Sequence, residues 1–310
     1  MHYLVTGGAG FIGSNIVEEL VKRGEKIRVL DNFSTGKREN LLGFNNRIEL
    51  LEGDIRSYHT VREGVEGVDV ILHHAALPSV PRSIRDPIAS NEANVTGTLN
   101  ILHAANDAGV KRVVFASSSS VYGDNAELPK HERMVLNPLS PYAVSKLAGE
   151  KYCAVFSHIY GLETVSLRYF NVFGPRQDPT SQYSAVIPKF VAQMMQGETP
   201  VIFGDGTQSR DFTFVENVVQ ANLLASTADC EPGSIMNCAC HHRITLNELV
   251  HSINTVLGTN IEPRYTTPRP GDIMHSFASI EEAMRKIGYK PVVPFIEGIR
   301  RTVDYFKCLH

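Results

Sequence analysis

The segment that most constrains the fold is residues 7–13, whose sequence is GGAGFIG. A short β-like run precedes it, and a helical pattern follows at residues 15–23. Glycine at Gly7, Gly10 and Gly13 permits a tight turn and lets the backbone approach a diphosphate closely. This spacing alone is a weak signal, and the strand before it and the helix after it make it specific. The segment therefore predicts a dinucleotide-binding turn at the start of a parallel sheet.

The first half of the chain alternates β-like runs with helical patterns, which is typical of a parallel sheet with crossover helices. We expect strands at residues 3–5, 27–30, 48–51, 68–72, 112–116 and 164–167, and helices at 15–23, 94–106 and 142–160. Further helices are expected at residues 186–196, 218–226, 246–256 and 296–305, where the alternation loosens.

The predicted fold class is α/β, a Rossmann-type doubly wound parallel sheet with a smaller C-terminal α/β substrate domain. We assign residues 1–170 and about 211–238 to the dinucleotide-binding domain. Residues from about 171 to 210 and from 239 to 310 form the expected substrate domain.

Bulk composition excludes several classes of protein. The net charge of −3 gives no strong field for nucleic acid or for an anionic membrane. No apolar run reaches the roughly 18 residues of a membrane span, and the N-terminus lacks the pattern of a signal peptide. The five cysteines, an odd count spread along the chain, suit a reducing compartment. We expect a cytoplasmic protein that binds neither nucleic acid nor membrane.

Two aspartates follow the second and third expected strands. Asp31 lies 18 residues after Gly13, where a carboxylate accepts hydrogen bonds from both adenosine ribose hydroxyls and repels a 2′-phosphate. This favours NAD over NADP. Lys37 and Arg38 lie close by and leave some room for NADP, although solvated loop charges explain them equally well. Asp54 either reaches the adenine or serves as a simple turn residue.

A second group of residues carries the chemistry. The strand at residues 112–116 runs into a serine cluster that includes Ser118, and Tyr142 and Lys146 are four apart on a helix that follows Pro141. Ligands bind beyond the carboxyl ends of parallel strands, so these groups are expected to meet in one crevice. A tyrosine has a pKa of about 10, which a nearby ammonium and a positive nicotinamide ring both lower. We predict Tyr142 as the base, Lys146 as its cationic partner and Ser118 as a proton relay or sugar ligand.

By these residues the chain resembles the extended short-chain dehydrogenase/reductase family, and within it the nucleotide-sugar 4-epimerases. The resemblance covers essentially all 310 residues. It rests on residues 7–13, His74-Ala75-Ala76, the serine cluster at 117–120, the Tyr142/Lys146 pair, and the segments 168–175 (RYFNVFGP), 204–211 (GDGTQSRD) and 269–272 (RPGD).

The resemblance implies that Ser118, Tyr142 and Lys146 are catalytic and that Tyr169 and Phe170 lie beside the nicotinamide. The full set of residues expected at the NAD is Gly7, Gly10, Phe11, Ile12, Gly13, Asp31, Asn32, Asp54, Ile55, Ala75, Ala76, Asn94, Ser117, Tyr142, Lys146 and Tyr169. Those expected to hold the UDP moiety are Asn171, Val186, Phe203, Arg210, Arg269 and Asp272, and those expected near the sugar are Ser79, Ser118, Ser119 and Ser276. The two arginines suit a diphosphate, which they can clamp by charge-assisted hydrogen bonds.

The resemblance also bears on the sugar. Ser276 stands where similar glucose-only epimerases carry a tyrosine, and a small side chain leaves room for a 2-N-acetyl group. Both UDP-N-acetylglucosamine and UDP-glucose, with their C4 epimers, therefore remain candidates. Pro78 departs from the lysine that is frequent in glucose-type epimerases, and it fits the residue 79–83 loop (SVPRS) of the other subgroup.

The serine cluster separates the expected reaction from its relatives. Similar 4,6-dehydratases place Thr-Asp-Glu over positions 118–120, and similar decarboxylases place a glutamate at 120, whereas this chain carries serines there. We therefore expect an isomerase that inverts C4 of a UDP-hexose through a transient 4-keto intermediate and reversible hydride transfer to bound NAD. The alternatives are another NAD-dependent nucleotide-sugar oxidoreductase or lyase and, with less support, a non-catalytic NAD-binding regulator.

Two further expectations concern metals and assembly. The run Cys238-Ala239-Cys240-His241-His242 lacks the wider cysteine spacing and the second pair of a zinc site, so we interpret it as packing and expect no metal. The family resemblance implies a homodimer in which helices at residues 94–106 and 142–160 pack across a two-fold axis.

Overall fold

A computed structural model describes residues 1–179, 185–268 and 274–308. Its centre is a seven-stranded parallel sheet in the order β11-β6-β5-β4-β1-β2-β3. The strands are β1 (His2–Thr6), β2 (Lys26–Asp31), β3 (Glu49–Glu52), β4 (Val70–His73), β5 (Arg112–Ser118), β6 (Glu163–Tyr169) and β11 (Ser234–Cys238). The predicted doubly wound Rossmann-type fold is therefore confirmed. Strand order reverses between β1 and β4, and such a switch point opens a crevice for a ligand.

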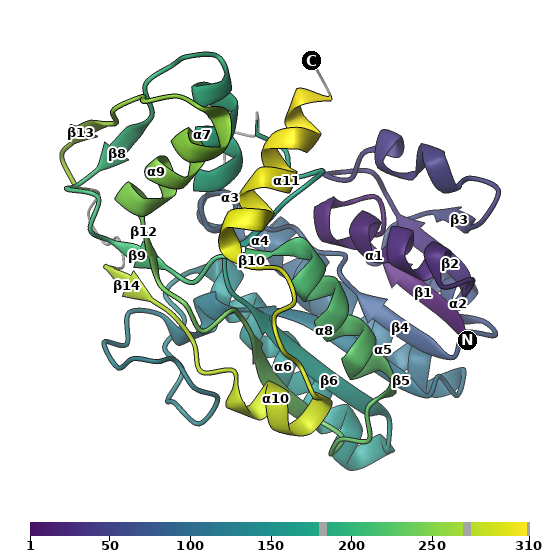
Figure 1. Ribbon diagram of the computed structural model, residues 1–310. Coiled ribbons are helices and arrows are strands. Elements are labelled where there is room, and N and C mark those ends of the chain that lie inside the picture. Colours follow the sequence, from purple (N-terminus) through teal and green to yellow (C-terminus); the bar gives the residue numbers. More distant parts are fainter. Residues whose placement is uncertain (180–184, 269–273, 309–310) are drawn as a thin grey trace.

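Helices cover both faces of the sheet (Figure 1). One face carries α1 (Phe11–Lys22), the 3-10 helix η1 (Arg38–Phe44) and α8 (Val215–Thr227), and the other carries α2 (Tyr58–Val65), α5 (Gly97–Asp107) and α6 (Pro141–Tyr160). Alternate strand residues supply the two cores, because successive side chains of a strand point to opposite faces. Tyr3 and Val5 pack with α1 and α8, whereas Leu4 packs with α2 and α5.

The helix α6 has well-defined ends. Pro141 occupies its first turn, where the missing N–H costs nothing, and Ser140 accepts a hydrogen bond from the Ala143 N–H at 3.1 Å. Gly161 ends the helix in a left-handed conformation, with φ of 75°. These signals place Tyr142 in the first turn of α6, at the carboxyl edge of the sheet.

The smaller part of the molecule has a core of its own, in which Phe173, Phe212, Phe214 and Phe295 pack ring against ring. Its elements are β7 (Val172–Phe173), α7 (Val186–Met195), β8 (Val201–Phe203), β9 (Ser209–Arg210), β10 (Thr213–Phe214), β12 (Ile244–Thr245), α9 (Leu246–Leu257), β13 (Arg264–Thr266), β14 (His275–Ser276) and α11 (Phe295–Lys307). Figure 1 shows these elements gathered at the upper left, beside the carboxyl edge of the sheet, with α11 crossing between the two parts.

Some elements differ from the sequence-based expectation. The helix expected at residues 94–106 begins as a π-helical turn, η2 (Glu92–Thr96), before α5. The short helices α3 (Val80–Arg85), α4 (Pro87–Asn91) and α10 (Glu281–Ile287) were not expected. Ala283 and Ile287 of α10, a helix within the range expected for the substrate domain, pack into the sheet core beside β11.

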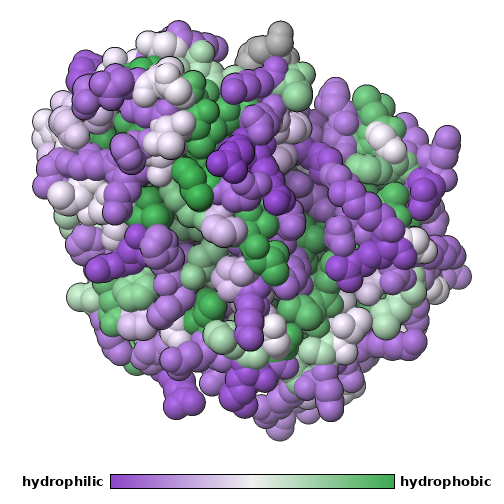
Figure 2. Space-filling view, viewed as in Figure 1, coloured by the Kyte–Doolittle hydropathy of each residue, from purple (hydrophilic) through white to green (hydrophobic). Residues whose placement is uncertain are grey.

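The surface seen from the side of Figure 1 is mostly hydrophilic, and its apolar side chains lie in separate patches (Figure 2). Across residues 1–179, 185–268 and 274–308, no helix combines the length and the apolar character that a bilayer crossing requires.

Candidate active site

A cleft of about 400 Å³ opens at the carboxyl ends of β1, β2, β4 and β5. Of the residues expected at the NAD, its walls contain Gly7, Gly10, Phe11, Ile12, Gly13, Asp31, Asn32, Asp54, Ile55, Ala75, Ala76, Ser117, Tyr142, Lys146 and Tyr169. Phe170, expected beside the nicotinamide, is instead buried in the core of the sheet. Asn94 is buried behind the cleft, where its side chain bonds the backbone of Leu77. Residues that the sequence did not single out also line the cleft, among them Arg56, Leu77 and Ala93.

The glycine turn leaves no room for side chains. A Cβ at Gly13 would lie 2.2 Å from the carbonyl oxygen of Gly7, and Gly7 itself has φ of 68°. Gly10 is the N-cap of α1 and supplies no side-chain cap, so the first N–H groups of the helix face the cleft uncovered. A helix N-terminus of this kind binds phosphate oxygens, and the turn fits a dinucleotide diphosphate.

Asp31, at the end of β2, is held in a fixed orientation. Its carboxylate accepts hydrogen bonds from the Ala9 N–H at 2.9 Å and the Phe33 N–H at 2.8 Å. Burial raises the pKa of Asp31, and these two donors partly offset the shift. The neighbouring cations are engaged elsewhere, because Lys37 pairs with Asp178 and Arg38 pairs with Glu52. The arrangement suits a ribose with free hydroxyls and therefore NAD.

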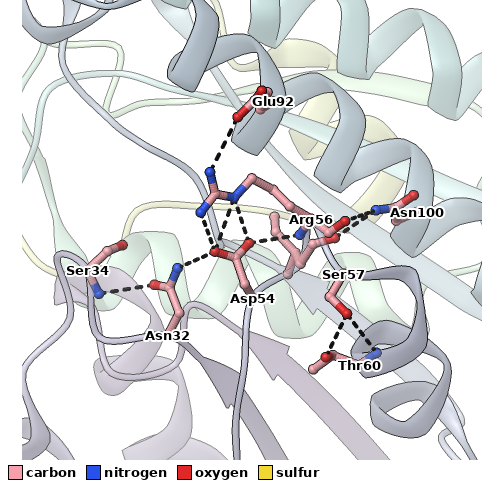
Figure 3. Close-up of polar contacts among 9 residues, drawn as sticks. Asn32, Ser34, Asp54, Arg56, Ser57, Thr60, Glu92 and Asn100 are labelled. Atoms are coloured by element: carbon pink, nitrogen blue, oxygen red, sulfur yellow. Dashed lines mark hydrogen bonds and ion pairs between the residues drawn. The ribbon is translucent and has the colours of Figure 1, made fainter.

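Asp54 belongs to a polar network at the rim of the cleft (Figure 3). Its carboxylate pairs with Arg56 at 2.8 Å and accepts a hydrogen bond from Asn32 at 2.9 Å. Arg56 in turn reaches Glu92 at 3.4 Å. The hydrogen bond from Arg56 is the main reason that the pKa of Asp54 falls to about 2. The side chain of Asp54 is thus ionised and partnered by Arg56 and Asn32 at the wall of the cleft.

The residues predicted to react meet at the other end of the cleft. The Lys146 ammonium lies 6.0 Å from the centre of the Tyr142 ring and donates a hydrogen bond to the Ala116 carbonyl at 2.8 Å. Burial lowers the pKa of Lys146 to about 8. Desolvation raises the pKa of Tyr142, and a hydrogen bond with Ser118 opposes that rise.

Ser118 is oriented by its neighbour. Its Oγ accepts hydrogen bonds from the N–H of Ser120 at 3.2 Å and from the Ser120 hydroxyl at 2.9 Å. Because both lone pairs of the Ser118 oxygen are then engaged, its proton is free to point at the Tyr142 oxygen. Ser118, Tyr142 and Lys146, predicted together from the sequence, are brought together by the fold.

A hydrogen-bonded chain that sequence reasoning missed holds Tyr169 against the cleft wall. The Tyr169 hydroxyl lies 2.9 Å from His74 Nε2 and accepts a hydrogen bond from the Asn222 amide at 2.8 Å. Burial lowers the pKa of His74 to about 4, so its ring is neutral at physiological pH. No spacing rule joins residues 74, 169 and 222, and only the packing of α8 on the sheet brings them together.

Behind the cleft, α6 is joined to the sheet by a buried ion pair. Arg168 on β6 and Glu150 on α6 form two hydrogen bonds of 2.8 Å, and their side chains are 2% and 0% exposed. Glu150 also accepts a hydrogen bond from Ser117 on β5 at 2.5 Å. The pair therefore connects the helix that carries Tyr142 and Lys146 to the strand that ends in Ser118.

The residues expected to hold substrate are spread over the smaller part and the cleft mouth, and none of those described lines the cofactor cleft. Ser79 precedes α3, Ser119 follows β5, Asn171 lies between β6 and β7, and Val186 begins α7. Arg210 on β9 lies beside Ser276 on β14. Phe203 borders a second cavity of about 600 Å³, together with Tyr265, Pro268 and Met274. Arg269 and Asp272 lie outside the described residues.

The cysteine–histidine run begins at Cys238, the last residue of β11, and only its first two residues are buried, since His241 and His242 are exposed. Cys238 is fully buried in the sheet core, and Cys240 accepts a hydrogen bond from Asn217 at 3.6 Å. His241 bonds the Ala278 carbonyl at 2.7 Å. In the parts of the chain that the structure describes, no group of three or more His, Cys, Asp or Glu side chains is placed to hold a metal.

Comparison with known proteins agrees with this geometry. A model described as the NAD dependent epimerase/dehydratase family matches residues 3–239. A UDP-glucose 4-epimerase from Mycolicibacterium smegmatis is 38% identical over 316 aligned positions, which cover 99% of each chain. The solved UDP-N-acetylglucosamine 4-epimerase from Methanobrevibacter ruminantium M1, in complex with UDP-N-acetylmuramic acid, has a TM-score of 0.95 and 41% identity and covers 100% of this chain and 99% of its own. The UDP-glucose 4-epimerase of Thermus thermophilus, in complex with NAD, has a TM-score of 0.89 and 38% identity over 99% of each chain.

Substitution at the glycine turn tests the diphosphate cradle. Gly13→Ala is expected to weaken NAD binding at least about tenfold, or about 1.4 kcal/mol, because the new Cβ meets the Gly7 carbonyl. Gly43→Ala is the matched control, since a Cβ there meets open space. Isothermal titration of NAD into each variant measures the effect, and an unchanged affinity in Gly13→Ala would contradict the assignment.

The lowered pKa of Lys146 predicts a dependence of stability on pH. Between pH of about 8 and 10.5 the unfolded state binds more protons at this lysine than the folded state, so its contribution to the free energy of unfolding rises with pH, by up to about 3 kcal/mol. The difference between the wild type and Lys146→Met in urea unfolding isolates this contribution. Lys151→Met, at an exposed position of the same helix, should give a flat difference. A flat curve for Lys146→Met as well would refute the shift.

Proposed function

The chain belongs to the NAD-dependent epimerase/dehydratase family, and we propose that it is an enzyme that inverts C4 of a UDP-hexose with NAD in the cleft of β1, β2, β4 and β5. The observation that carries the proposal is the meeting of Ser118, Tyr142 and Lys146 at one end of this cleft. Bound NAD supplies a site that takes a hydride from C4 and gives it back.

The protein residues move the proton. Tyr142 takes the C4 hydroxyl proton as its phenolate, and it returns the proton when C4 is reduced again. Ser118 stabilises the phenolate by a hydrogen bond, and the Lys146 ammonium adds a positive charge at close range. Because the sugar leaves the site with C4 inverted and with no net change in oxidation state, the products and reactants are isomers.

Residues of the cleft account for cofactor binding in this proposal. Gly7, Gly10 and Gly13 seat the diphosphate on the N-terminus of α1, and Asp31 holds the adenosine ribose. The remaining walls that the predicted residues form consist of Phe11, Ile12, Asn32, Asp54, Ile55, Ala75, Ala76, Ser117, Tyr142, Lys146 and Tyr169.

The residues near Ser118 favour epimerisation over the other reactions of the family. Ser119 and Ser120 carry hydroxyls, whereas elimination of a sugar hydroxyl needs a carboxylic acid or carboxylate at the reacting carbons. A regulator that only binds NAD would have no use for Ser118, Tyr142 and Lys146 gathered at one end of the cleft. Net oxidation and epimerisation are distinguished by whether NADH accumulates during turnover.

We propose that the substrate is a UDP-hexose that carries either a hydroxyl or an N-acetyl group at C2. Ser276 and Arg210 are neighbours on β14 and β9, and the serine adds little volume there. The similar proteins act on UDP-glucose and on UDP-N-acetylglucosamine, according to their names. We propose that Asn171, Val186, Phe203, Arg210, Arg269 and Asp272 hold UDP, and that Ser79, Ser118, Ser119 and Ser276 face the sugar.

We place the enzyme in the cytoplasm, in galactose metabolism. All five cysteines fall within the described residues and are unpaired, which suits a reducing compartment. Turnover of UDP-glucose and UDP-galactose would connect it to the use of galactose.

Substitution of Tyr142 tests the proposed reaction. Tyr142→Phe should lower kcat for a UDP-hexose by about 10²-fold or more, with the fold retained, because it removes the base. Tyr160→Phe, on the exposed end of the same helix, is the control and should be fully active. UDP-glucose, UDP-N-acetylglucosamine and UDP-glucuronate are incubated separately, products are resolved by chromatography, and absorbance at 340 nm is followed. Product without accumulated NADH supports the proposal, whereas stoichiometric NADH would indicate a dehydrogenase.

We further propose that the protein is a homodimer. Val144, Val155 and Ile159 on α6 are 52%, 45% and 64% exposed, at spacings that place them on one helix face, and Ile88 on the adjoining α4 is 72% exposed. Light scattering is expected to give twice the chain mass of 34.2 kDa, and Ile159→Glu should shift the mass toward the monomer. A monomeric wild type at micromolar concentration would contradict the dimer.

A further inference from the structure

Ser83, the last residue of the 79–83 segment, touches the helix that carries the catalytic residues. It lies on α3 and is 0% exposed. Its Oγ donates a hydrogen bond to the Val80 carbonyl at 2.8 Å and accepts one from the backbone N–H of Tyr142 at 3.0 Å. The contact therefore joins α3 to the catalytic residue itself, 59 positions further along the chain.

The N–H of Tyr142 needs such a partner. The first N–H groups of a helix have no acceptor within the helix. Pro141 has no N–H, the Ala143 N–H bonds the Ser140 side chain, and the Val144 N–H bonds the Ser140 carbonyl. In this first turn, the N–H of Tyr142 is the group that donates to a residue outside the helix and its cap, namely the Ser83 hydroxyl.

The carbonyl of Tyr142 is tied to the same region of the chain. It accepts a hydrogen bond from the Ser145 hydroxyl at 2.8 Å, and Ser145 accepts one from the Asn94 amide at 3.0 Å. Asn94 bonds both the N–H and the carbonyl of Leu77, at 2.7 and 3.2 Å. Segment 77–94 therefore contacts both backbone polar groups of Tyr142. Ser83 bonds the N–H directly, and Asn94 reaches the carbonyl through Ser145.

This region also reaches the sugar site. Ser79, expected at the sugar, is the N-cap of α3 and has φ of 109°, a conformation that is rare for a residue other than glycine. Strained backbone of this kind persists where surrounding contacts fix it, and it is frequent at functional sites. One short helix therefore has a sugar-facing residue at its start and the anchor of Tyr142 one turn later.

We propose that Ser83 is a positioning residue for Tyr142: it fixes the first turn of α6 so that the phenol stays within reach of Ser118 and of the sugar C4 hydroxyl. The inference rests on the proposed epimerase function, because it assigns a role in that reaction. Ser83 does not line the cofactor cleft, and its role is through its hydrogen bond with the backbone of Tyr142.

The test compares Ser83→Ala with Ser90→Ala. Ser90 on α4 is also buried, at 1% exposed, and its hydroxyl bonds a local carbonyl, that of Asp86, at 3.0 Å. Both substitutions delete one buried hydroxyl with a local bond, and Ser83→Ala alone leaves the Tyr142 N–H without its acceptor. Ser83→Cys, which keeps the volume and a weak acceptor, is a third variant that guards against loss of folding.

We expect kcat of Ser83→Ala to fall by about 10- to 100-fold, with KM and NAD content near the wild type, because small misplacement of a reacting group is costly. The acidic limb of the kcat–pH profile should move to higher pH, since a displaced phenol loses the Ser118 hydrogen bond that lowers its pKa. Ser83→Cys should lie between, and Ser90→Ala should match the wild type.

Equal kcat and equal pH profiles in Ser83→Ala and Ser90→Ala, with an active wild type, would overturn the positioning role and leave the proposed function standing. A change in KM alone would also overturn it. A wild type that converts no UDP-hexose would remove the proposed function itself, and the role of Ser83 with it.

Discussion

The geometry of the site depends on the buried ion pair between Glu150 and Arg168. Two charges removed from water are retained only with close mutual contact, and here each side chain is fully partnered. Because Glu150 also accepts a hydrogen bond from the Ser117 hydroxyl, the pair fixes α6 against both β5 and β6. The distance between the end of β5, which carries Ser118, and the first turns of α6, which carry Tyr142 and Lys146, follows from that fixed register. Removal of one partner would leave an uncompensated charge directly behind the reacting residues.

At this site, contacts between residues close in the chain and contacts between residues far apart in the chain have different roles. In the proposed cofactor site the glycine turn depends on backbone geometry, and the carboxylate of Asp31 is oriented by the N–H groups of Ala9 and Phe33. The phenol of Tyr142 is influenced in opposite directions, because desolvation raises its pKa and Ser118 lowers it. A positive charge in the cleft is the further factor that favours the phenolate, and Lys146 provides one on the same helix.

The sequence allowed prediction of what depends on local spacing. The turn at residues 7–13, the individual parallel strands and the Tyr142/Lys146 pair all follow from patterns within about ten residues. Asn94 illustrates the limit: its assignment to the cofactor came from resemblance, whereas its amide bonds the Leu77 backbone behind the cleft. The contacts of Tyr169 with His74 and Asn222, and of Tyr142 with Ser83, join residues far apart in the chain. Such contacts depend on how helices pack on the sheet and on side-chain rotamers, which no periodicity encodes.

The central claim is that hydrogen leaves C4 and returns to C4 within one enzyme-bound cofactor. A UDP-hexose that carries deuterium at C4 tests this claim directly, with the position of the label in the epimerised product read by mass spectrometry and NMR. We expect the product to retain deuterium at C4 in ordinary water. Replacement of the deuterium by solvent hydrogen would contradict it, because the hydrogen would then have left as a proton and not as a hydride.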